Sequence, residues 1–305
     1  MSLALLFPGQ GIQHPAMLPW IDGGSQAGNP LSLLERELGS DWRARLDDPA
    51  WATQNTVAQY LLTGLCLAAW QQLASRLPVP VAIAGYSVGE LAAFCAAGVF
   101  EAGEAMRLAR CRAIEMDLSV AGLDTGLLSV SGLRPHDISE ICTQYGLAVA
   151  IRINDESLVL GGPCAALTAA EQAAVRSGAH CSRLQVRLAS HTPWMASAAQ
   201  AFARTIEPML FKAPRVHLVA NLTGGSVREV CQLKQALSGQ IASTVQWDRC
   251  METLAERRVR CVLEVGPGQS LSRMWNARYP DVPARSVDDF QSGDAVVAWV
   301  SRMLD

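Results

Sequence analysis

The pattern Gly-x-Ser-x-Gly at residues 85–89 places Ser87 in a context suited to nucleophilic chemistry. A short apolar run at 80–83 precedes it and an alanine-rich stretch at 91–97 follows it, which predicts a strand, a sharp turn and a helix. The two glycines suit such an elbow, because the turn is strained and brings the strand and the helix into close contact. The N-terminus of the helix would also favour negative charge that develops beside the serine. The same pattern occurs in plain glycine-rich turns, but the flanking strand and helix favour a catalytic serine.

A serine hydroxyl needs a general base within hydrogen-bonding distance, because it is a weak nucleophile at neutral pH. The sequence contains five histidines, at positions 14, 136, 180, 191 and 217. Only His14 and His191 fall in loops that we expect at the edge of the main sheet. His191 is the stronger candidate, because the chain re-enters the larger domain there and faces the predicted cleft.

Strands and helices alternate along the parts of the chain that must position these residues. The first strand ends in the turn Phe7-Pro8-Gly9-Gln10-Gly11, and a strand at 260–265 ends in Gly266-Pro267-Gly268-Gln269. Open α/β sheets place their chemistry in turns at the carboxyl ends of buried strands. Both turns are therefore expected at the edge of the sheet, although the first, taken alone, could be only a tight turn.

The middle of the chain follows a different order of elements. The patterns predict strands at 126–131, 148–153, 157–161 and 180–188, with helices at 135–145 and 163–177. The order βαββαβ is that of a ferredoxin-like unit, which is complete in itself. Residues 124–188 are therefore expected to form a small subdomain inserted into a larger α/β domain.

The composition is that of an ordinary globular protein. Half of the 305 residues are apolar and the formal net charge is −3, which indicates no general affinity for nucleic acid. The nine cysteines are scattered and contain no C-x-x-C pair, so we expect free thiols in a reducing cytoplasm and no metal site. The N-terminal apolar run lacks a basic segment, and no stretch is long enough to span a membrane, so neither a signal peptide nor a membrane partner is expected.

Six motifs together resemble the malonyl-CoA:acyl-carrier-protein transacylase family in their order and approximate spacing. They are Phe7-Pro8-Gly9-Gln10-Gly11, Gly85-Tyr86-Ser87-Val88-Gly89-Glu90, Arg112-x-x-x-Met116, Ser190-His191, Val245-Gln246-Trp247 and Glu264-Val265-Gly266-Pro267-Gly268. They span nearly the whole chain, so the match is specific. The resemblance implies an α/β-hydrolase-like catalytic subdomain at 1–123 and 189–305, with a ferredoxin-like small subdomain inserted at 124–188.

The same resemblance implies a Ser-His dyad without an acidic third member. In it Ser87 is the nucleophile and His191 the general base. The family orients the histidine through a backbone carbonyl, and the matching residue is Gln246. The oxyanion hole would be formed by the backbone N–H groups of Gln10 and Val88, which meets the need for two fixed donors beside the nucleophile.

Arg112 matches the arginine that binds the malonyl carboxylate in this family. The planar guanidinium group of arginine can contact both carboxylate oxygens at once. The pattern of residues alone does not distinguish Arg112 from Arg107 and Arg110, which lie on the same predicted helix and read as solvated surface charges.

Acyl carrier proteins are usually acidic, so a surface that docks one should be basic and near the mouth of the cleft. Three arginines are candidates for this surface, although each could equally be an ordinary surface charge: Arg183, Arg187 and Arg249.

Tyr86 departs from the family pattern, in which a histidine usually precedes the nucleophile. Together with Gly-Gln-Gly-Ile-Gln-His-Pro at 9–15, the elbow most resembles the transacylase (epsilon) subunit of malonate decarboxylase. That subunit loads malonyl groups onto a carrier protein that bears a dephospho-CoA-derived thiol. The departure concerns the carrier and the pathway and leaves the chemistry unchanged.

The expected function is therefore transfer of malonyl from malonyl-CoA, through an acyl-enzyme at Ser87, to the thiol of an acyl carrier protein. The carrier would be that of malonate decarboxylase, with an acceptor thiol of the phosphopantetheine type and no bound cofactor. One alternative is a malonyl transacylase of fatty-acid or polyketide synthesis. A serine esterase, which would not need Arg112, and a non-catalytic scaffold are more distant alternatives.

Overall fold

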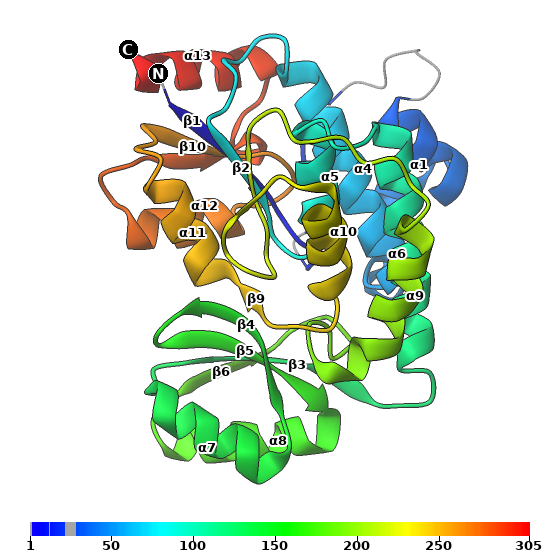
Figure 1. Cartoon of the computed structure of the whole chain (residues 1–305), viewed down its shortest axis with the longest axis vertical. Coiled ribbons are helices and arrows are strands. Elements are labelled where there is room, and N and C mark those ends of the chain that lie inside the picture. Colours follow the sequence, from blue (N-terminus) through cyan, green and yellow to red (C-terminus); the bar gives the residue numbers. More distant parts are fainter. Residues whose placement is uncertain (1, 12, 22–28) are drawn as a thin grey trace.

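The structure is a computed structural model that describes residues 2–11, 13–21 and 29–305. Ile12, which belongs to the N-terminal glycine motif, lies outside the described residues. The fold is mixed α/β and contains a six-stranded and a five-stranded sheet. Figure 1 shows the smaller sheet below the larger one, with helices α7 (Pro135–Tyr145) and α8 (Cys164–Arg176) on its far side.

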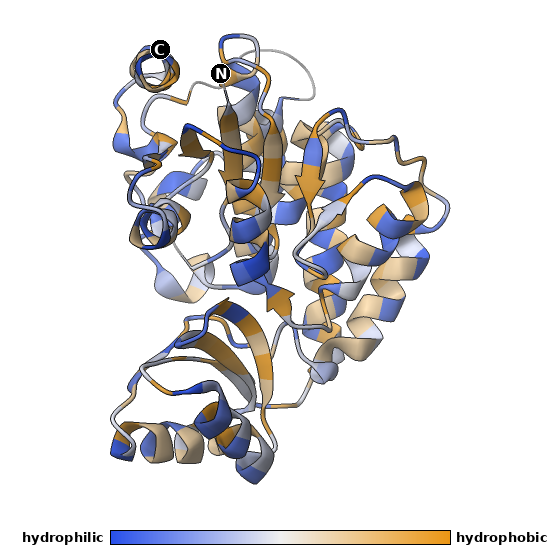
Figure 2. Ribbon diagram, turned by 60° about the vertical axis from the view of Figure 1, so that its left-hand side comes forward, coloured by the Kyte–Doolittle hydropathy of each residue, from blue (hydrophilic) through white to orange (hydrophobic). Residues whose placement is uncertain are grey.

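The larger sheet has the strand order β11-β10-β1-β2-β7-β8, and its neighbours are parallel except for β7 and β8. Its central strands are hydrophobic in Figure 2, and β1 is buried along its whole length, as expected for a parallel sheet covered on both faces. The strands are β1 (Leu3–Phe7), β2 (Ala82–Gly85), β7 (His217–Val219), β8 (Ser226–Val227), β10 (Cys261–Glu264) and β11 (Ala284–Ser286).

Helices cover both faces of this sheet. Alternate residues of β1 point to opposite faces, so their core clusters show which helices lie on each face. Leu3, Leu5 and Phe7 share a core cluster with α4 (Asn55–Leu73), α5 (Gly89–Ala96), α6 (Ala102–Ser119), α9 (Ala196–Ile206) and α13 (Gly293–Leu304). Ala4 and Leu6 share another with α11 (Trp247–Ala255) and α12 (Ser270–Arg278). The other helices are α1 (Pro30–Leu38), α2 (Trp42–Arg45), α3 (Pro49–Ala52), α10 (Val230–Gly239), and the short 3-10 turns η1 (Pro193–Met195) and η2 (Val287–Asp289).

The smaller sheet has the strand order β6-β3-β5-β4-β9. The first four strands are antiparallel to their neighbours, and β9, which comes from a later part of the chain, pairs with β4 in parallel. Side chains of α7 and α8 share a core cluster with β3 and β5. The strands are β3 (Thr125–Ser131), β4 (Ala148–Asn154), β5 (Ser157–Pro163), β6 (His180–Arg183) and β9 (Val245–Gln246).

Residues 125–183 contain strands and helices in the predicted order βαββαβ, but the end of the last strand there, and three short strands elsewhere in the chain, differ from the prediction. The last strand ends at Arg183 and not at residue 188, because after the N–H of Leu184 donates to Leu127 O (3.1 Å) the chain leaves the sheet. The strands β8, β9 and β11 were not predicted, since two or three residues show no alternation to detect.

The turn between β2 and α5 leaves no space for a side chain at either glycine of the elbow. A Cβ atom on Gly85 would lie 2.3 Å from the carbonyl oxygen of Gly89, and one on Gly89 would lie 2.2 Å from the carbonyl oxygen of Phe7. The absence of both Cβ atoms lets α5 begin directly against β1 and β2. Ser87 is thereby held at the carboxyl edge of the larger sheet.

Two further observations concern membrane-spanning helices and cysteines. Within the described ranges, no helix has both the length and the hydropathy of a transmembrane span. All nine cysteines are free thiols.

We predict that Gly89→Ala destabilises the protein by about 1–3 kcal/mol or more, because the new methyl group overlaps a backbone carbonyl that cannot move freely. The matched control is Gly103→Ala in α6, where nothing lies within 4 Å of the added Cβ. That control should be neutral or gain about 0.5–1 kcal/mol. Urea unfolding of both variants measures the difference, and equal stability would contradict the close packing at the elbow.

Candidate active site

Ser87 and His191 meet at the carboxyl edge of the larger sheet. Ser87 follows β2 after one residue, and His191 lies in the segment that returns from the smaller sheet, shortly before η1. The Oγ atom of Ser87 lies 2.8 Å from Nε2 of His191. The two residues predicted as nucleophile and base are thus within hydrogen-bonding distance.

A backbone carbonyl determines which nitrogen of His191 carries the proton. Nδ1 lies 2.6 Å from the carbonyl oxygen of Gln240. A carbonyl oxygen only accepts hydrogen bonds, so Nδ1 is the protonated nitrogen and donates. The lone pair of Nε2 then faces the hydroxyl of Ser87, which is the tautomer that a general base requires.

Burial keeps this imidazole neutral. His191 is 1% exposed, and burial together with the nearby positive charge of Arg112 lowers its pKa to about 3. The hydrogen bond to Gln240 opposes this shift only in part. His191 is therefore in its basic form throughout the neutral pH range.

Both residues adopt a backbone conformation that is unusual for residues with a side chain. The φ angle is +56° at Ser87 and +63° at His191. Such left-handed conformations cost on the order of 1 kcal/mol or more and persist only where the surrounding structure enforces them. The fold thus maintains strain on both sides of the Ser87–His191 hydrogen bond.

The loop after β1 lies against the nucleophile. A Cβ on Gly9 would be 3.6 Å from Cβ of Ser87, so the next residue, Gln10, begins beside the site. The N–H groups of Gln10 and Val88 donate to no other described residue, whereas the N–H of Ser87 donates to Oδ1 of Asn221 at 2.8 Å. Gln10 and Val88 therefore remain the candidate donors of an oxyanion hole.

The carbonyl that orients His191 belongs to Gln240, so the assignment of Gln246 from the sequence is wrong. Gln240 is the C-cap of α10, and a helix leaves its last carbonyls without a partner inside the helix. Gln246 lies in β9, where it pairs with Arg152, and its N–H donates to the carbonyl of Asn221 (2.9 Å). It is therefore committed to the smaller sheet and to the strand ends.

Arg112 is a buried cation near the dyad. It is 1% exposed; its Nη1 donates to Oε1 of Gln59 (2.6 Å) and its Nη2 to Oε1 of Gln240 (3.4 Å). Its Nε has no hydrogen-bond partner among the described residues. Burial lowers its pKa to about 10 while the charge of Glu90 opposes the shift, so the guanidinium stays charged at neutral pH.

The neighbouring arginines of α6 differ from Arg112 in their surroundings. Arg107 and Arg110 are exposed and form ion pairs with Glu104 and Glu37. A buried cation with a spare donor is suited to bind an anionic group of a substrate, and surface ion pairs are not.

The three arginines proposed for carrier docking lie in different settings. Arg187 is exposed and lines a cavity of about 210 Å³ together with Gln10, which links it to the candidate site. Arg183, at the end of β6, forms an ion pair with Glu171 (2.9 Å). Arg249 is an exposed residue of α11.

Sequence reasoning missed several residues that hold the site together. Gln59 is a polar residue in the otherwise apolar middle of α4, and Asn221 follows a buried strand at the carboxyl edge of the sheet. Both positions were signals that could have been used. Gln240 binds His191 through its main chain, which leaves no signal in the sequence.

The arrangement suits covalent acyl transfer. A serine hydroxyl faces a neutral imidazole, two N–H groups are free near the nucleophile, and a buried cation lies beside them. In the part of the chain that the structure describes, no group of three His, Cys, Asp or Glu side chains is arranged to hold a metal ion.

We predict that the rate at which phenylmethylsulfonyl fluoride labels Ser87 is nearly constant from pH 8 down to about pH 5. The reactive form has neutral His191, and its lowered pKa of about 3 extends that form to acidic pH. The reagent tests the base without assuming a substrate. A rate that falls by half near the ordinary histidine pKa of about 6.5 would contradict the effect of burial.

The geometry agrees with comparisons to known proteins. Residues 47–288 match the family model described as the acyl transferase domain. A malonyl CoA-acyl carrier protein transacylase of Mycobacterium tuberculosis (strain ATCC 25618 / H37Rv) is 34% identical over 294 residues, which cover 93% of this chain and 96% of that relative. The protein of the same name from Haemophilus influenzae is 28% identical over an alignment of 313 residues. The match covers 97% of this chain and 98% of that relative.

The same likeness extends to a solved structure. The crystal structure of FabD from Acinetobacter baumannii matches with a TM-score of 0.89 and 27% identity, and the match covers 99% of this chain and 98% of that one. Since the family model covers most of the chain and a relative above 30% identity is matched almost end to end, this protein belongs to the acyl transferase domain family.

Proposed function

We propose that the protein is a malonyl-CoA:acyl-carrier-protein S-malonyltransferase. The observation that carries the proposal is the buried guanidinium of Arg112 close to the Ser87–His191 pair. A cation in that position can bind an acyl group that ends in a carboxylate. The names of the relatives from Mycobacterium tuberculosis and Haemophilus influenzae support the same activity.

The first half of the reaction forms an acyl-enzyme. His191 Nε2 takes the proton of the Ser87 hydroxyl while Oγ attacks the thioester carbon of malonyl-CoA. We assign the resulting oxyanion to the N–H groups of Gln10 and Val88. The C–S bond then breaks and the CoA sulfur leaves with the proton from Nε2, so that malonyl remains on Ser87 as an ester.

The second half is the reverse reaction with a different thiol. The thiol of the carrier, on a phosphopantetheine-type arm, gives its proton to Nε2 of His191 and its sulfur attacks the ester carbon. The ester C–O bond breaks and Oγ of Ser87 regains the proton. The scheme needs no bound cofactor, because only one proton and one acyl group move.

Arg112 would select malonyl over acyl groups without a carboxylate. Gln59 and Gln240 accept hydrogen bonds from its Nη atoms and hold the planar guanidinium in place, while its Nε is free to donate. A carboxylate that enters this buried position is stabilised by the fixed positive charge of the guanidinium. The attraction is strong because little water is present there to screen it.

Two kinds of carrier fit the proposal. One is an ordinary acyl carrier protein, such as a carrier of fatty-acid or polyketide synthesis, and the names of the relatives, which include an acyl carrier protein, favour it. The other is the carrier of malonate decarboxylase, which Tyr86 and the motif at 9–15 favour. In the structure the Tyr86 ring packs edge-on against the ring of Trp247, with 5.0 Å between the ring centroids. Malonyl transfer to a carrier with a phosphopantetheine arm, compared with one that bears a dephospho-CoA-derived arm, distinguishes the two.

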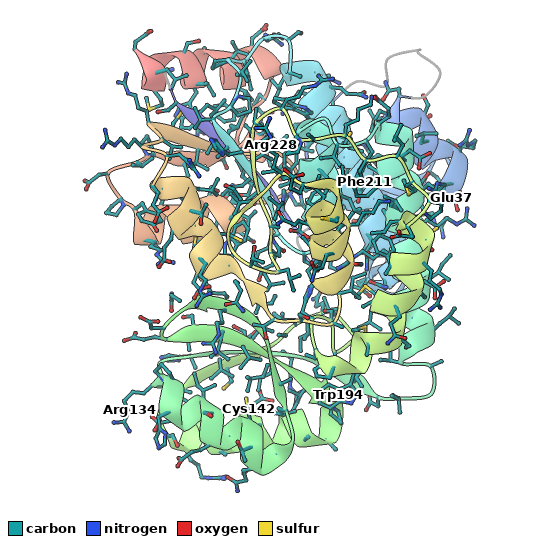
Figure 3. The ribbon with its side chains drawn as sticks, viewed as in Figure 1. Glu37, Arg134, Cys142, Trp194, Phe211 and Arg228 are labelled. Atoms are coloured by element: carbon teal, nitrogen blue, oxygen red, sulfur yellow. The ribbon has the colours of Figure 1, made fainter. Side chains whose placement is uncertain are left out.

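We further propose that the chain divides into an α/β-hydrolase-like catalytic subdomain, at 1–123 and 189–305, and a ferredoxin-like small subdomain at 124–188. The strand order β6-β3-β5-β4 supports the second name, although β9 extends that sheet from outside the range. Figure 3 shows Trp194, just after His191, beside the smaller sheet. The nine free thiols support a reducing compartment such as the cytoplasm.

We expect Arg112→Ala to lower kcat/KM for malonyl-CoA at least ~30-fold, since truncation of a buried ion pair costs on the order of 2 kcal/mol or more. Turnover of acetyl-CoA, which has no carboxylate, should hold or improve, and Arg112→Lys should recover only part of the loss. Arg110→Ala, on the same helix but in an exposed ion pair, is the matched control and should change neither substrate. An equal loss of malonyl and acetyl turnover in a folded Arg112→Ala protein would remove Arg112 as the carboxylate anchor.

We also expect Arg187→Glu to raise KM for the carrier protein severalfold, because an acidic carrier is repelled at the cavity that contains Gln10. The rate of Ser87 acylation by malonyl-CoA should stay the same. Charge reversal at Arg183 and Arg249 tests the other two proposed contacts, and the ion pair of Arg183 predicts the smaller effect there. If Arg187→Glu slows acylation and carrier transfer alike, Arg187 has a structural role and is not a docking residue.

A further inference from the structure

The strained backbone of Ser87 requires something to hold it. Serine at φ +56° lacks the conformational freedom of glycine. The strain would be relieved if the backbone of Ser87 changed to a negative φ angle. Such a change would also move Oγ away from His191. The elbow therefore needs contacts that hold its backbone in this conformation.

A single carboxamide provides two bonds to that backbone. Oδ1 of Asn221 accepts from the N–H of Ser87 (2.8 Å), and Nδ2 of Asn221 donates to the carbonyl of Gly85 (2.5 Å). The carboxamide thus spans the peptide groups on both sides of Tyr86. Asn221 is completely buried and lies two residues beyond β7, which pairs with β2 in parallel.

Asn221 is itself held from two sides. Its N–H donates to Oε1 of Glu90, in the first turn of α5, at 2.6 Å. Its carbonyl accepts from the N–H of Gln246 at 2.9 Å. Its side chain therefore meets the elbow from a fixed backbone.

We propose that Asn221 is a positioning residue, whose carboxamide holds the strained elbow and keeps Oγ of Ser87 aligned with His191. It also occupies the N–H of Ser87, so that an oxyanion must be bound by other donors, which are those of Gln10 and Val88. The proposal rests on acylation of Ser87 as described under the proposed function.

The two bonds require both an acceptor and a donor on one short planar group. Asparagine supplies both, an ionised aspartate supplies only acceptors, and a protonated aspartic acid supplies both again. The rate of Ser87 acylation in Asn221→Asp should therefore depend on pH, since the aspartic acid can make both bonds only when it is protonated. Burial raises the pKa of a carboxyl group and so extends the protonated form toward neutral pH. Two titratable groups contact Asn221 itself, the carboxyl group of Glu90 and the thiol of Cys250. The charge of Arg112 acts on Glu90, and His191 contacts Ser87.

The experiment compares single-turnover rate constants for Ser87 acylation by malonyl-CoA between pH 5.5 and pH 8. The variants are Asn221→Asp and Asn221→Leu, each measured relative to wild type at the same pH. The matched control is Asn276→Asp, because Asn276 makes the same pair of bonds with the backbone of Ala284, both 2.9 Å, away from the site. A single-turnover rate constant does not depend on how much of a preparation is folded.

We expect both Asn221 variants to acylate on the order of 10²-fold more slowly than wild type at pH 8, the typical cost of a nucleophile displaced by about 1 Å. The deficit of Asn221→Asp should shrink at least ~10-fold at pH 5.5, while that of Asn221→Leu stays constant. KM for malonyl-CoA should hardly change, and Asn276→Asp should show no dependence on pH relative to wild type.

The proposal is overturned if Asn221→Leu acylates at the wild-type rate, or if the deficit of Asn221→Asp is the same at both ends of the pH range. A lower melting temperature with normal rate constants would likewise assign Asn221 a purely structural role. The same series with phenylmethylsulfonyl fluoride separates the two proposals. If wild type reacts with that reagent but not with malonyl-CoA, the proposed function fails and the role of Asn221 is still tested.

Discussion

The hydrogen bond between Ser87 Oγ and His191 Nε2 joins residues that are 104 positions apart, and the rest of the structure makes that contact possible. The elbow after β2 presents the serine, and the segment that returns from the smaller sheet presents the histidine. Two consecutive residues hold the histidine, since its N–H donates to the carbonyl of Ile241 (2.9 Å) and its Nδ1 to that of Gln240 (2.6 Å). Strain at both residues is the cost of bringing their side chains together at one edge of the sheet.

Burial lowers the pKa of two basic side chains of this site but leaves them in different charge states. His191 starts from a pKa of 6.5, and burial lowers it to about 3, so the imidazole is neutral. Burial lowers the pKa of Arg112 from its ordinary value to about 10, so the guanidinium remains a cation. Gln240 contacts both, through its carbonyl and its side chain. One buried environment thus contains a neutral base and a fixed positive charge, as transfer of an acidic acyl group requires.

The features that could be predicted from the sequence are those written in local patterns. The elbow at 85–89 and the βαββαβ order have such patterns, and the structure contains both. Gln240 was missed because any residue type can offer a carbonyl, and the strands of two or three residues were missed because they show no periodicity. Arg112 was separated from Arg107 and Arg110 only by resemblance to a family, since burial depends on what packs around α6 and not on α6 itself.

The central claim is that the malonyl group is bound covalently to Ser87 after it leaves the thiol of CoA and before it reaches the thiol of the carrier. The most direct test is mass spectrometry of peptides after incubation with malonyl-CoA and no carrier protein. The account predicts one malonyl group on the peptide that contains Ser87, none in Ser87→Ala, and loss of the group when a carrier thiol is added. A malonyl group on a cysteine such as Cys95, or no covalent adduct in the wild-type protein, would contradict it.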